Sequence, residues 1–128
     1  MTSTTRSAPR TTAPGDLKQE ILRLYNAVNQ DMWRIGVRRQ RVDLLGDQIV
    51  IVAEHERVPA LAVLDADHRP LTRMVDGALL DENKRRLKDV LSRALGVPIR
   101  VILKDYDPDT QMAATVILLE RPLTTGGS

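Results

Sequence analysis

The stretch that decides the fold runs from Leu95 to Glu120 and reads LGVPIRVILKDYDPDTQMAATVILLE. It predicts a helix that ends at Gly96, a strand that begins after Pro98, an acidic turn and a second strand. Residues 112–119 are apolar at both alternating positions, which is typical of a strand that lies inside a sheet or is covered on both sides. The stretch therefore predicts a β-hairpin, and none of its side chains forms a catalytic motif.

A second hairpin is predicted upstream, over residues 37–54. Gly46-Asp47 is a two-residue turn of the type that joins twisted strands. With this turn, apolar residues of one parity meet on a single face, which we expect to lie in the core: Val42, Leu44, Ile49, Ile51 and Ala53. The opposite face is mixed, because arginines and Asp43 on the first strand lie against Val50, Val52 and Glu54 on the second.

Helices are predicted before the first hairpin and between the two hairpins. Residues 16–35 carry apolar residues at three- and four-residue spacing, with Asp16 as the cap and Gly36 as the stop. A short helix is predicted for 59–66, and a longer one for 71–95 that is either continuous or bent near Gly77. The order predicts an α+β fold: a four-stranded, mainly antiparallel sheet with helices packed on one face.

The chain of 128 residues predicts one domain over 16–120, with a disordered tail over 1–15 and a flexible tail over 121–128. The sequence has 19 basic and 17 acidic residues, so its net charge of +2 does not demand a polyanionic partner. The absence of cysteine excludes disulfides and thiolate zinc sites. No apolar run reaches the roughly 18 residues of a membrane span, and the first residues do not read as a secretory signal. We therefore expect a cytoplasmic protein.

Several candidate sites in the sequence lack the residue pattern that catalytic or metal chemistry needs. The run from Asp105 to Thr110 alternates carboxylates as a calcium loop does, but an EF-hand needs glycine and glutamate where Thr110 and Val116 stand. His55 and His68 lack ligand spacing and are predicted to lie in loops. Ser92 lies in a predicted helix without a nucleophile elbow, and no glycine-rich nucleotide motif occurs. We expect no cofactor, no metal and no enzymatic activity.

Two further hypotheses about function stay open. The run Arg34, Arg38, Arg39 and Arg41 is the densest basic segment, so it is a candidate contact for an anion or a nucleic acid. The alternative is a solvated sheet face in which Glu54 pairs with Arg39. The other hypothesis is an enzyme built from scattered carboxylates, although no partner geometry supports it. Its residues are Asp43, Glu54, Asp105 and Asp107.

From about residue 16 to 120 the chain resembles the MpsC-like family, small bacterial domains named after a Na⁺-translocating, membrane-potential-generating system. The resemblance rests on Leu24-Tyr25 in a leading helix, the Gly-Asp turn, the helix ending at Gly96, the Asp-Pro turn over 105–109 and the closing Leu119-Glu120. Residues 33–37 and 58–61 depart from the family pattern, which indicates a divergent member. The resemblance implies an accessory domain with a protein partner, linked to Na⁺ translocation.

Assembly follows from the apolar pattern. Helices on one side of a sheet cover only one face, so the residues expected on the other face predict an exposed apolar patch. We assign to this patch Val50, Val52, Ile102, Ala113, Ile117 and Leu119. We expect a two-fold homodimer, formed by sheet faces or by joined edges. The alternative is that segment 58–68 folds over this face.

Overall fold

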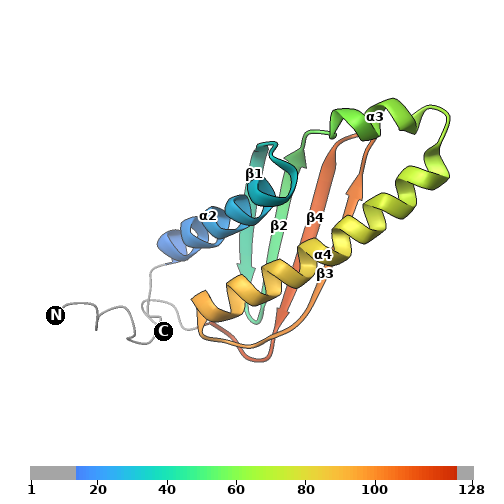
Figure 1. The fold of residues 1–128 in the computed structure, drawn as a ribbon. Helices are drawn as coiled ribbons and strands as arrows, with labels where there is room; N and C mark the ends of the chain where they lie inside the picture. Colours follow the sequence, from blue (N-terminus) through green and yellow to red (C-terminus); the bar gives the residue numbers. More distant parts are fainter. Residues whose placement is uncertain (1–13, 124–128) are drawn as a thin grey trace.

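The computed structural model of the chain describes residues 14–123. The tails predicted for 1–15 and 121–128 lie outside these residues, except for 14–15, which begin the first helix, and 121–123. Helices and strands follow the predicted order (Figure 1). They are α2 (Pro14–Trp33), β1 (Val37–Leu45), β2 (Gln48–His55), α3 (Pro59–Asp65), α4 (Arg69–Leu95), β3 (Ile99–Asp107) and β4 (Met112–Leu119). The predicted α+β fold is confirmed.

The four strands form one sheet in the order β1-β2-β4-β3, and every neighbouring pair is antiparallel. Strand β4 therefore lies in the interior of the sheet, as its apolar residues at both parities predict. In the first hairpin Leu44 pairs with Ile49 and Leu45 with Gln48, which is the register that the Gly46-Asp47 turn predicts. Gly46 has φ +63°, the left-handed region that a turn of this kind needs and that glycine adopts at little cost.

The core lies between the sheet and the two long helices. Helix α2 packs along β1, α4 packs along β3, and the two helices touch each other on the same face of the sheet (Figure 1). Aliphatic side chains fill this layer, together with the ring of Tyr25. Its fully buried members from helix and sheet are Leu17, Ile21, Ile49, Ile51, Ala53, Leu87, Leu91 and Ile117.

Helix α4 is continuous from Arg69 to Leu95, so the open question at Gly77 is resolved in favour of one helix. A Cβ built at Gly77 would meet no atom within 4 Å, so packing does not require glycine there. The helix ends as predicted at Gly96, whose φ is +69° and whose N–H donates to Ser92 O at 3.2 Å.

The predicted interface is wrong for four of its six residues. Ile102, Ala113, Ile117 and Leu119 are at most 5% exposed, because they lie on the helix-covered face. On β3 a register shift between Ile99 and Val101 breaks the alternation, so Ile102 turns into the core while Leu103 turns out. On β4 the sequence is apolar at both parities, and the parity is set by pairing with β2: Ile117 lies opposite Ile49.

The acidic turn is also shorter than predicted. Strand β3 continues through Asp105 to Asp107, and the turn occupies residues 108–111. Gln111 closes it with φ +63° and donates its N–H to Asp107 O at 2.7 Å.

The second face of the sheet, which we call the open face, is crossed by no helix of the described part of the chain (Figure 1). Segment 58–68 does not cover it either, because α3 contacts α4 on the opposite side of the sheet. Large apolar side chains on this face are exposed: Leu45 at 57%, Val52 at 39%, Val101 at 37%, Leu103 at 54% and Met112 at 38%. Between them Val50, Val116 and Leu118 are half-buried.

Candidate functional site

A pocket opens where α2 and β2 both end. Residues 56–58 leave the sheet here and lead into α3, which packs against the first half of α4. The empty space of this pocket is about 500 Å³ when the open solvent at its mouth is included. Its walls are mostly apolar, from Trp33, Ile35, Val58, Leu61, Leu79 and Leu80, while His55, Lys104 and Tyr106 supply polar groups.

Lys104 is the central polar group of the pocket. Its Nζ donates to Asn83 Oδ1 at 2.7 Å and to the Tyr25 hydroxyl at 3.3 Å. It also lies 4.7 Å from the centre of the Tyr25 ring and 5.8 Å from that of Trp33, within the range of cation–π attraction. No carboxylate within residues 15–123 forms an ion pair with Lys104. Burial lowers the pKa of Lys104 to about 7.

His55 lies beside Lys104, and the prediction of a loop histidine is wrong for it. It is the last residue of β2, and its Nε2 is 2.7 Å from the Tyr25 hydroxyl. Burial, and next the charge of Lys104, lower the pKa of His55 to about 4. Because the Tyr25 oxygen accepts from Lys104, we assign its proton to the bond with a neutral His55. His68 lies before α4 and is exposed, as predicted.

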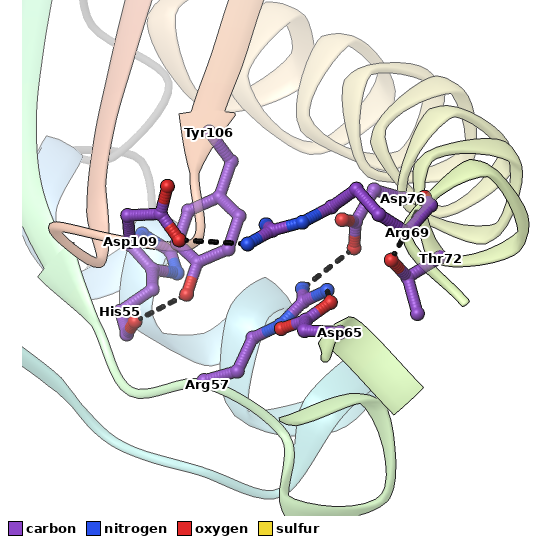
Figure 2. Close-up of polar contacts among 8 residues, drawn as sticks. All are labelled: His55, Arg57, Asp65, Arg69, Thr72, Asp76, Tyr106 and Asp109. Carbon is purple, nitrogen blue, oxygen red and sulfur yellow. Dashed lines mark hydrogen bonds and ion pairs between the residues drawn. The ribbon is translucent and has the colours of Figure 1, made fainter. Parts of the chain in front are cut away.

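One wall of the pocket is held by a buried arginine. The side chain of Arg57 is only 6% exposed and donates to both carboxylate oxygens of Asp65, at 2.9 and 2.8 Å, and to Asp76 at 2.8 Å (Figure 2). The guanidinium holds the pKa of Asp65 at about 2. It also lies 5.7 Å from the ring centre of Tyr106, whose hydroxyl donates to His55 O at 2.9 Å. These bonds fix residues 55–58 and α3 against α4.

The predicted anion contacts lie elsewhere, on β1 at the edge of the sheet. Arg38 and Arg39 each lie 3.5 Å from Glu54, and Arg41 lies 3.2 Å from Asp43. The pairing of Arg39 with Glu54 is the one the sequence predicts. Arg34 is exposed and precedes the strand with φ 59°.

The scattered carboxylates do not converge. Asp43 and Glu54 lie on β1 and β2, whereas Asp105 and Asp107 lie on β3 at the far edge. In the acidic turn Asp107 accepts from the N–H and hydroxyl of Thr110, at 3.0 and 2.6 Å, and Asp109 pairs with Arg69 at 3.0 Å (Figure 2). Within residues 14–123 no three His, Asp or Glu side chains are grouped so that they could hold a metal ion.

Apart from His55, a candidate metal ligand by residue type, the polar residues of the pocket are not predicted from the sequence. The sequence does contain a weak signal for a polar cluster in the core. Asn29 and Asn83 interrupt the apolar stripes of their helices at positions that are fully buried. A buried amide needs a partner, so each predicts a polar neighbour in the core. Lys104 gives no such signal, since it reads as an ordinary charged residue at the end of an apolar run.

None of the family models, curated proteins or solved structures compared with the chain matches it. The resemblance to the MpsC-like family therefore stays a prediction. No helix in the described range is long and apolar enough to pass through a bilayer.

Proposed function

We propose that the chain is a non-enzymatic interaction domain that forms a homodimer through the open face of its sheet. The observation that carries this proposal is the set of exposed apolar side chains on that face, above all Val52 and Leu103. An apolar patch on a small soluble domain is costly to leave in water and usually marks an interface. Two sheets stacked face to face pack about 10 Å apart with their strands nearly aligned.

Charges at the two edges of the open face favour a second copy of the chain as the partner. On β1, Arg38, Arg39 and Arg41 outnumber the carboxylates that they contact, Glu54 and Asp43. On β3, Asp105 and Asp107 are exposed, and among residues 14–123 they accept hydrogen bonds only from groups of their own turn and strand. One edge is therefore basic and the other acidic.

The strand register gives this dimer a definite geometry. Arg41 pairs with Val52, Val52 with Ala114 and Ala114 with Asp105, so Arg41 and Asp105 end the same row across the sheet. A two-fold axis parallel to the strands would lay β1 of one copy over β3 of the other at the same level. Arg41 then faces Asp105 of the second copy twice, by symmetry.

Charge reversal tests this arrangement. Arg41→Asp and Asp105→Arg should each shift the chain from dimer to monomer in light scattering, and the double variant should recover the dimer. Reversing Arg93, which is exposed on α4, is the control and should leave the mass unchanged. A monomer for the unsubstituted chain at tens of micromolar, or a double variant no better than either single one, contradicts the proposal.

Nucleic-acid binding is the second candidate. Its support is that Arg38, Arg39 and Arg41 have side chains 60%, 84% and 77% exposed along one edge. Binding to phosphates would weaken steeply with salt. Fluorescence anisotropy of labelled RNA and DNA at low salt measures it, and an unchanged signal at low salt rules it out.

The resemblance to the MpsC-like family adds the proposal that the domain serves a Na⁺-translocating system as an accessory protein with a membrane-associated partner. Co-sedimentation of the chain with membranes of its native host tests this link. Recovery of the chain in the supernatant alone, at low ionic strength, would count against it.

A further inference from the structure

The pocket around Lys104 holds chemistry that an interaction domain does not need. An amine lies among Trp33, Tyr25 and His55 without a carboxylate partner in the described residues. We propose that this pocket binds a small, neutral aldehyde or ketone with an apolar body, and that the Lys104 amine joins it reversibly as an imine.

The hydrogen bonds of Lys104 leave its reactive electron pair free. A neutral amine has two N–H groups and one lone pair. The two N–H groups are used by Asn83 Oδ1 at 2.7 Å and the Tyr25 hydroxyl at 3.3 Å. Because Lys104 lines the pocket, the lone pair is left for a molecule that enters it. The lowered pKa keeps a large share of the amine neutral near pH 7, as a nucleophilic lysine needs.

The charges around the pocket select a neutral ligand over an anion. Arg57 is the only other cation among the lining residues, and Asp65 and Asp76 both bind it. Glu56 adds a further negative charge at the wall. With Lys104 neutral, the lining residues hold one cation, Arg57, and two carboxylates, Glu56 and Asp76, so a carboxylate ligand would meet repulsion. The apolar remainder of the wall, with Leu61, Leu79 and Leu80, suits a hydrocarbon body.

The proposed step is balanced without a further reactant. The Lys104 nitrogen forms a bond to the carbonyl carbon while the C=O π bond breaks, and a proton moves from nitrogen to oxygen to give a carbinolamine. The C–O bond then breaks, water leaves with the second amine proton, and a C=N bond remains. The Tyr25 hydroxyl, between Nζ at 3.3 Å and His55 Nε2 at 2.7 Å, is placed to pass a proton between them.

The experiment uses the full chain with hexanal and sodium cyanoborohydride at pH 7, followed by digestion and mass spectrometry. The chain has four lysines, Lys18, Lys84, Lys88 and Lys104, so each reports separately. We expect Lys104 to be reductively alkylated at least about tenfold faster than Lys84, because an ordinary lysine is almost wholly protonated at this pH. Denaturing urea should remove the difference. Alkylation of Lys104 no faster than of Lys84 in the folded chain overturns the proposal.

A second aldehyde tests the ligand class without any substitution. Glyoxylate carries the same reactive group with a carboxylate. The ratio of Lys104 to Lys84 alkylation should be higher with hexanal than with glyoxylate. An equal or higher ratio with glyoxylate overturns the assignment of a neutral, apolar ligand. Both measurements are independent of the oligomeric state, so their outcome does not depend on whether the proposed homodimer forms.

Discussion

Asn83, in the middle of α4, accepts a hydrogen bond of 2.7 Å from Lys104 on β3. The amide of Asn83 also donates to Asn29 Oδ1 on α2, at 3.3 Å. Two helices and a strand are thereby joined by polar side chains within an otherwise aliphatic core. Such buried bonds add little net stability, but an alternative packing that broke them would leave polar groups unpaired. We infer that they fix how α2 and α4 sit on the sheet.

The pKa of Lys104 predicts an unusual dependence of stability on pH. Burial lowers this pKa to about 7, so between pH 7 and about 10 the folded chain holds fewer protons at Lys104 than the unfolded chain. Raising the pH through this window therefore favours the folded state. We expect the free energy of unfolding in urea to rise from pH 7 to pH 9, by about 2 kcal/mol at most.

The matched variant for this prediction is Lys104→Met, which keeps the length of the side chain and removes the titrating group. Its unfolding free energy should lose the rise between pH 7 and 9. Lys84→Met, on the solvent side of α4, should keep it. Equal slopes for the unsubstituted chain and Lys104→Met would mean that Lys104 stays protonated in the folded state.

Arg57 should be worth far more to stability than any surface arginine. Its buried guanidinium binds two carboxylates, and Arg57→Ala would leave Asp65 and Asp76 facing each other without it. We expect a loss of about 2–4 kcal/mol in the free energy of unfolding. Arg93→Ala breaks an exposed pair with Asp89 on α4 and should cost about 0.5 kcal/mol or less. Similar losses for the two variants in urea titrations would refute the structural role given to Arg57.

The sequence predicts the elements well, because their signals are local. Gly46-Asp47 dictates a turn whose geometry sets the pairing of Leu44 with Ile49, and Gly96 dictates a helix end. What it does not predict depends on contacts between distant segments. Which residues of β3 face the core depends on a register shift near Arg100, and no residue type in the sequence predicts that shift. The pocket brings together Trp33, His55 and Lys104, which are too far apart in the sequence to form a local motif.

Two glycines of opposite role offer a test of the helix. Gly77 lies within α4 on an open surface, so Gly77→Ala should raise the free energy of unfolding by about 0.5–1 kcal/mol. Gly96 ends the helix with φ +69°, so Gly96→Ala should lower it by about 1 kcal/mol. Thermal or urea unfolding measures both. A stabilising Gly96→Ala would mean that the helix does not end in the left-handed conformation.

Ile102 and Leu103 are neighbours on β3 that point to opposite faces, and they separate folding from assembly. Ile102 is 5% exposed in the core, so Ile102→Lys should unfold the chain by burying an unpaired charge. Leu103 is 54% exposed on the open face, so Leu103→Lys should leave the circular dichroism of the subunit unchanged and, if the proposed dimer exists, yield a monomer in light scattering. Ile117 is 0% exposed, so by the same reasoning Ile117→Lys should unfold the chain, whereas Val52→Lys should not. A folded Ile102→Lys together with an unfolded Leu103→Lys would reverse the two faces of β3.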